Sequence, residues 1–137
     1  MKRWGLFLLR VTIGWLLVLW GIDKFQDVAH GQAVAETYYF GIGTQAVLLK
    51  IFGAAEILLG ALVVLGLWRK RVYPLMFAIL LITAIGVWKS IIDPWGWFLE
   101  GSSVLFYPSA IIAAGALLLW GTMDEDAMSL DAVTARD

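Results

Sequence analysis

Cysteine is missing from this chain of 137 residues. The protein can therefore form no disulfide, no thiolate metal site and no thiol-exchange centre of its own. Its single histidine, His30, cannot provide the two ligands of a bis-histidine haem within one chain. Charged residues make up only 15% of the sequence and form no basic stripe, so we expect no nucleic acid among its partners.

Side chains suited to covalent or metal catalysis are also scarce. Ser102, Ser103 and Ser109 have no histidine or other evident base beside them in the sequence, and the carboxylates show no metal-ligand spacing. We therefore predict no catalytic residue, no metal site and no covalent cofactor. A non-catalytic subunit is favoured over an enzyme.

Apolar residues dominate what is present. They make up 61% of the chain, and its mean hydropathy is +0.84. A soluble domain of this length could not bury so much apolar surface. A lipid bilayer accepts it when helices satisfy every backbone hydrogen bond. The composition predicts an all-α integral membrane protein in contact with the lipid bilayer.

Four apolar runs are each long enough to span, because about 20 residues cross the hydrocarbon core. The expected helices cover about residues 4–22, 45–67, 72–92 and 102–121. Short connections favour antiparallel neighbours, hence a four-transmembrane-helix bundle over residues 1–121. Residues 122–137 form an acidic tail.

Basic residues near the helix ends set the expected orientation. The richer side holds Lys2, Arg3, Arg69, Lys70 and Arg71, and the other side holds Lys24 and Lys89. The richer side is cytoplasmic, so both termini and the acidic tail are predicted in the cytoplasm. An N-terminus that retains Lys2 and Arg3 is typical of a protein in a bacterial inner membrane. Tryptophans agree with this topology as interface anchors: Trp4, Trp68 and Trp120 at the inner ends, and Trp20, Trp88, Trp95 and Trp97 at the outer ends.

Two charges lie within the expected spans, where a charged side chain must face protein or water. Arg10 lies about two turns into the first helix, and Glu56 lies near the middle of the second. We hypothesise that they pair. The pair either locks the two helices together or forms a quinone, ligand or proton site.

A second polar group gathers at the outer helix ends. It comprises Asp23, Lys24, Lys50, Lys89, Asp93 and Glu100. These side chains either snorkel and pair locally at the interface or form a polar site for an anionic headgroup or a quinone. Together with Arg10 and Glu56, all of them except Glu100 are the candidate ligand-binding residues.

Glycines recur with the same spacing in the first two helices, at Gly14 and Gly21 and at Gly53 and Gly60. This pattern is a weak sign of duplication. More simply, it predicts a seam of small residues where helices approach closely.

Several short segments resemble the DoxX family. They are Leu8-Leu9-Arg10 with Gly14, Gly21-Ile22-Asp23-Lys24-Phe25, Gly53-Ala54-Ala55-Glu56 with Gly60, and Leu65-Gly66-Leu67. The resemblance implies a four-helix bundle, with Arg10 and Glu56 in the places of the family's intramembrane arginine and glutamate. It also implies an association with quinone-linked sulfur oxidation or membrane oxidoreductase complexes.

Two functions remain open at this point. The first is a membrane subunit of a redox complex, which acts either as an anchor or as the subunit that binds a quinone or a partner protein. Its candidate noncovalent ligand is a quinone or a lipid. The alternative is a supernumerary structural subunit of a large respiratory or photosynthetic complex. Both expect other membrane or peripheral subunits as partners. Transport ranks last, because the cytoplasmic half offers few polar residues besides Arg10.

Overall fold

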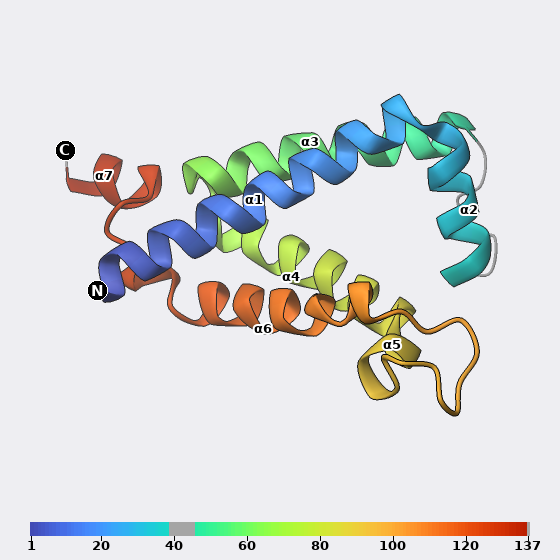
Figure 1. The fold of residues 1–137 in the computed structure, drawn as a ribbon. Helices are drawn as coiled ribbons and strands as arrows, with labels where there is room; N and C mark the ends of the chain where they lie inside the picture. Colours follow the sequence, from blue (N-terminus) through green and yellow to red (C-terminus); the bar gives the residue numbers. More distant parts are fainter. Residues whose placement is uncertain (39–45, 137) are drawn as a thin grey trace.

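A computed structural model describes residues 1–38 and 46–136, and all regular structure in these residues is helical (Figure 1). The long helices are α1 Lys2–Gln26, α3 Ala46–Leu65, α4 Arg69–Gly86 and α6 Pro108–Gly121. They run in alternating directions along the molecule. The shorter elements are α2 Val28–Tyr38, α5 Trp88–Ile92, η1 Val104–Phe106, η2 Met123–Glu125 and α7 Leu130–Arg136.

Three helical stretches of the described chain are long and apolar enough to cross a membrane: Lys2–Gln26, Ala46–Leu65 and Val104–Gly121. The expected third span, 72–92, is not among them. It corresponds to α4 and α5, which are separated at Val87, and α4 also carries three basic residues in its first turn. Length and hydropathy therefore support a membrane protein with three candidate spans.

The glycines of α1 and α3 form a close helix-helix seam. A Cβ added to Gly21 would lie 2.5 Å from the carbonyl oxygen of Gly53, and one added to Gly60 would lie 2.5 Å from that of Gly14. Only residues without side chains allow the two backbones to approach so closely. The equal glycine spacing thus reflects an antiparallel register, in which Gly14 faces Gly60 and Gly21 faces Gly53.

Helices α4 and α6 pack together and complete the core beneath α1 and α3. The largest cluster of buried side chains draws on all four long helices. Its members are Leu6, Ile13, Leu17, Leu59, Val63, Val72, Tyr73, Met76, Leu80, Ala116 and Leu119.

The outward faces of the helices remain apolar as well. Only 28% of the most apolar stretch of α3 and 17% of the stretch Val104–Gly121, which combines η1 and α6, is buried inside the molecule. Leu58 on α3 and Ile111 on α6, for example, are 63% and 64% exposed. Such surfaces suit hydrocarbon rather than water, which supports contact with a lipid bilayer.

The turn between α3 and α4 uses backbone conformations with positive φ. Gly66, with φ of 71°, ends α3, and its N–H donates to the carbonyl oxygen of Leu62 at 2.9 Å. Trp68 then adopts φ of 53° directly before α4. This tight connection brings the start of α4 and the end of α3 to the same end of the molecule as Lys2.

Candidate functional site

Arg10 does not pair with Glu56, contrary to the hypothesis drawn from the sequence. Its side chain is buried, and its Nε lies 2.7 Å from Oδ2 of Asp126. Its guanidinium also donates to the carbonyl oxygens of Val64 and Met128 and lies over the ring of Phe7. The guanidinium therefore satisfies a carbonyl at the C-terminal end of α3, where a cation is favoured.

The register of the glycine seam explains why the expected pair does not form. Since Gly14 faces Gly60, residue 10 of α1 lies opposite residue 64 of α3. Glu56 lies about 12 Å further along α3, at 1.5 Å per residue. Arg10 instead pairs with the carboxylate of Asp126.

Residues 122–136 fold back over the end of the molecule that holds the start of α1 and the turn between α3 and α4, where we expected only an acidic tail. This end is called the inner end below, and the opposite end, with α2 and α5, the outer end, after the predicted orientation. Asp131 accepts hydrogen bonds from the backbone N–H groups of Trp68 at 3.0 Å and Arg69 at 2.8 Å. Lys2 and Glu125 form an exposed ion pair, and the guanidinium of Arg69 donates to the carbonyl oxygen of Met123. Acidic residues of this segment thus bind the start of α1 and cap the start of α4.

Glu56 pairs with Lys24, a residue that we had assigned to the separate outer group. Their Oε1 and Nζ atoms are 2.7 Å apart, and the side chains of Glu56 and Lys24 are only 13% and 22% exposed. The second carboxylate oxygen of Glu56, Oε2, is buried and has no hydrogen-bond partner among the described residues. An unpaired buried oxygen of this kind calls for an explanation, and one explanation is a donor that binds there.

The remaining outer residues do not assemble into one site. Asp23 lies 2.8 Å from Nδ1 of His30 in an exposed pair, and Lys50 is exposed on α3. Lys89 is exposed, with its Nζ 5.9 Å from the ring centroid of Trp88. Asp93 is buried in the loop after α5, and Glu100 is exposed further along the same loop.

Asp93 has a local structural role. Its carboxylate accepts backbone hydrogen bonds from Phe98 at 2.6 Å, Leu99 at 2.9 Å and Trp97 at 3.1 Å. The N–H of Phe98, followed by those of Leu99 and Trp97, holds the pKa of Asp93 below its ordinary value of 3.8, although burial opposes this shift. The charged form of Asp93 therefore organises this loop.

Two clefts are defined by described residues. A cleft of about 510 Å³ at the inner end is lined by Trp68, Arg69, Lys70, Arg71, Met123, Asp124 and Asp131. A groove of about 300 Å³ lies between α1 and α6 and is lined mostly by aliphatic side chains. Neither is lined by Lys24 or Glu56. In the described part of the chain, no three His, Asp or Glu side chains are arranged to hold a metal ion.

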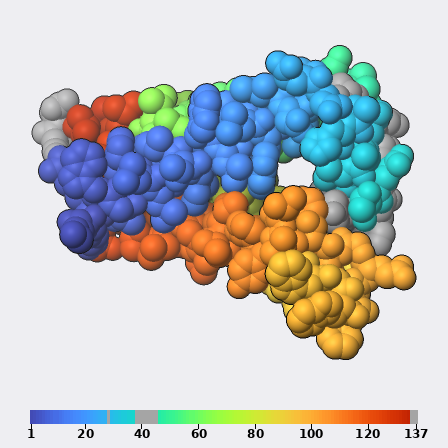
Figure 2. Space-filling model, viewed as in Figure 1, coloured from blue at the N-terminus to red at the C-terminus, as the bar shows by residue number. Residues whose placement is uncertain are grey.

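Figure 2 shows a further opening at the outer end, between α2 with the last turns of α1 on one side and the start of α6 on the other. Lys24 belongs to those last turns of α1. The Lys24–Glu56 pair therefore lies toward the open end of the molecule, and the Arg10–Asp126 pair lies at the closed end.

The sequence analysis named Arg10 and Glu56 as charges within the spans, but it did not name Asp126 and Asp131 as partners of basic residues or backbone groups. The available signal was a group of acidic residues directly after the last apolar run, at the helix end where the predicted topology also places most of the basic residues. The sequence model of the DoxX family matches residues 5–90. Searches of curated proteins and of solved structures find no match.

Proposed function

This chain belongs to the DoxX family, and from that premise we propose that it is an integral membrane subunit of a redox complex and binds a quinone headgroup at Lys24 and Glu56. The family match covers α1, α3 and α4, which include both of these residues. The apolar helices support residence in a lipid bilayer, which is also where quinones are found.

We also propose that α4 with α5 forms a fourth span and that both termini face the cytoplasm of a bacterial inner membrane. Two observations support this topology. The four long helices alternate in direction (Figure 1), and the exposed cations Lys2, Arg3, Lys70 and Arg71 lie at the end where the Lys2–Glu125 pair joins the two terminal segments. An excess of basic residues marks the cytoplasmic side.

The observation that carries the ligand proposal is the half-paired carboxylate of Glu56. Oε1 faces the Lys24 ammonium at 2.7 Å, whereas Oε2 is buried without a partner among the described residues. A buried acceptor that stays unpaired costs about 1–3 kcal/mol. A hydroxyl of the reduced headgroup, the quinol, would donate to Oε2 and remove that cost, whereas the carbonyl oxygen of the oxidised quinone can only accept, as from Lys24.

The roles of the two side chains follow from their chemistry. Glu56 Oε2 accepts a hydrogen bond from a hydroxyl and can take up its proton. Lys24 pairs with the Glu56 carboxylate at 2.7 Å, and its ammonium can also donate to a carbonyl oxygen of the ligand. A bound quinone would supply the electron-carrying chemistry, and this chain would orient its headgroup and hold a proton at Glu56.

The alternative is a structural subunit of a large respiratory or photosynthetic complex, without chemistry of its own. The broad apolar faces of α3 and α6 favour it, because they offer packing surface to other membrane subunits. The separation of both defined clefts from Lys24 and Glu56 favours it as well.

Mild extraction of the protein from native membranes tests the two functions. We would compare the wild type with Glu56→Gln and, as a control, with Lys50→Gln, which changes an exposed cation on the same helix. Mass spectrometry would then quantify copurifying quinones and proteins. We expect quinone with the wild type and the control, and its loss from Glu56→Gln.

Two results would count against the quinone site. Quinone retained equally by all three proteins would place it elsewhere. A stoichiometric large complex without quinone on this subunit, unchanged by Glu56→Gln, would make the structural alternative the better one.

A further inference from the structure

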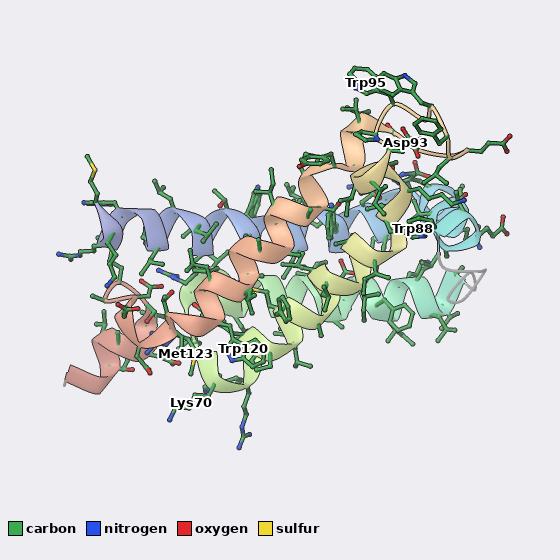
Figure 3. All side chains as sticks on the ribbon, turned by 90° about the horizontal axis from the view of Figure 1, so that it is seen from below. Lys70, Trp88, Asp93, Trp95, Trp120 and Met123 are labelled. Atoms are coloured by element: carbon green, nitrogen blue, oxygen red, sulfur yellow. The ribbon has the colours of Figure 1, made fainter. Side chains whose placement is uncertain are left out.

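The loop from Asp93 to Tyr107, which joins α5 to α6, projects from the outer end of the molecule (Figures 1 and 3). Figure 3 shows Trp95 at the far end of the loop and Asp93 closer to the helices. Its large apolar side chains point outward: Trp97 is 77% exposed, Leu105 is 82% exposed and Phe98 is 88% exposed. These apolar side chains of the loop are therefore left uncovered by the described part of the chain.

The apolar side chains of this loop point outward, whereas several of its backbone N–H groups donate to acceptors within the loop and on α5. The Asp93 carboxylate accepts from three successive N–H groups, those of residues 97–99. The N–H of Gly96 donates to the carbonyl oxygen of Asp93 at 3.1 Å. One buried carboxylate with its own carbonyl thus binds the four N–H groups of residues 96–99.

Serine hydroxyls do the same in the second half. Ser90 Oγ on α5 accepts from the N–H of Ser103 at 2.9 Å, and Ser103 Oγ accepts from that of Leu105 at 3.3 Å. The N–H groups of Phe106 and Tyr107 donate to backbone carbonyls three residues earlier. Ser90 is buried, so this bracing also ties the loop to α5.

A loop in water has no need of this arrangement, since solvent satisfies its N–H groups. In a medium poor in water, each unsatisfied donor is costly. Internal acceptors for the N–H groups of residues 96–99, 103 and 105–107, together with outward apolar side chains, therefore suit a lipid interface, and tryptophan rings favour the headgroup boundary.

We propose that residues 93–103 form a preformed membrane anchor that lies in the plane of the outer interface, with Trp97 and Phe98 inserted into lipid and Leu105 extending this surface at the start of the candidate span Val104–Gly121. This goes beyond an end-of-helix role for single tryptophans. The apolar surface continues from the loop onto α6 at Ile111, which favours a continuous bilayer as the occupant. Exposed Glu100 limits the depth of insertion, because its charge stays in water.

The absence of cysteine allows a clean test, since one introduced cysteine is the only thiol. Phe98→Cys, Glu100→Cys and Ile111→Cys all change exposed side chains. Each variant would carry an environment-sensitive fluorophore and be reconstituted into vesicles of phosphatidylethanolamine and phosphatidylglycerol. Ile111 serves as the lipid-facing reference.

Nitroxide lipids labelled near the headgroup or near the chain end, together with aqueous iodide, then report the position of each fluorophore. We expect the headgroup-side nitroxide to quench position 98 strongly and iodide to quench it weakly. At position 100 the order should reverse, and position 111 should respond to lipid nitroxides. Iodide quenching of position 98 as strong as that of position 100 would place the loop in water and overturn the proposal.

Protection of position 98 from both lipid nitroxides and iodide would overturn it in another way, because a second copy or another protein would then cover the loop.

As an independent measurement, Asp93→Asn in the Phe98→Cys protein weakens the bracing of the loop. We expect the fluorophore to become more mobile and less accessible to the lipid nitroxide. An unchanged signal would show that Asp93 does not position the anchor.

Discussion

Replacing Asp126 with asparagine removes the charge that faces Arg10 at 2.7 Å while nearly preserving side-chain volume. Both side chains are 2% exposed, so the guanidinium cannot recover its hydration without opening the fold. Its remaining partners are the carbonyl oxygens of Val64 and Met128. Breaking a buried ion pair by removing one partner costs about 3–5 kcal/mol, and we expect Asp126→Asn to lower the free energy of unfolding by about this amount.

Unfolding in mixed micelles with increasing denaturing detergent, followed by circular dichroism, measures this loss. A double-mutant cycle with Arg10→Met isolates the pairwise part. The double variant should be clearly more stable than the sum of the two single losses predicts, because it leaves no buried unpaired charge. As a control, Lys2→Gln breaks the exposed Lys2–Glu125 pair and should cost no more than about 1 kcal/mol.

Two outcomes would refute this reasoning. Asp126→Asn without loss of stability would mean that residues 122–136 do not cover Arg10 in the membrane. Strong coupling of Arg10→Met to Glu56→Gln, and none to Asp126→Asn, would restore the pair first expected from the sequence.

Three further predictions concern the seam, the inner end and the loop. Gly21→Ala places a Cβ 2.5 Å from a carbonyl oxygen of α3 and should destabilise by about 1–3 kcal/mol, whereas Gly5→Ala, with nothing within 4 Å, should change little; detergent unfolding measures both. Asp131→Ala removes the carboxylate that caps α4 and should cost about 1 kcal/mol, with faster hydrogen exchange in the first turn of α4. The lowered pKa of Asp93 means that its stabilisation of the loop is present at neutral pH and is lost as the pH falls through 3.8 and below. The amide signal of Phe98 in NMR spectra should titrate accordingly, and the same titration in Asp93→Asn would contradict this assignment.

The helical character of the protein and the seam between its first two helices could be predicted because both depend on local patterns. Long apolar runs predict spanning helices in any context. Gly14 and Gly21 in the first helix recur at the same spacing as Gly53 and Gly60 in the second, which is typical of close helix packing, and the structure places Gly14 opposite Gly60. The count of four spans stays a prediction, since the basic first turn of α4 and the interruption at Val87 separate that region from the three candidate spans.

The partners of the buried charges could not be predicted in the same way. The sequence led us to pair Arg10 with Glu56, because an unpaired charge within a membrane span costs free energy. Their actual partners, Asp126 and Lys24, depend on the register of α1 against α3 and on the path of the last residues. A shift of the register by about two turns would have brought Glu56 opposite Arg10 without any change of composition.

The sequence by itself determined that this chain is a helical membrane protein of the DoxX family, because hydropathy, glycine spacing and family motifs are properties of neighbouring residues. Only the tertiary structure decided that Arg10 closes the inner end with Asp126, that Glu56 keeps one oxygen unpaired among the described residues, and that the loop after α5 folds around Asp93. The physical reason is that pairing in a low-dielectric interior is selected by distance and burial. Both are set by how helices pack, and no local pattern records them.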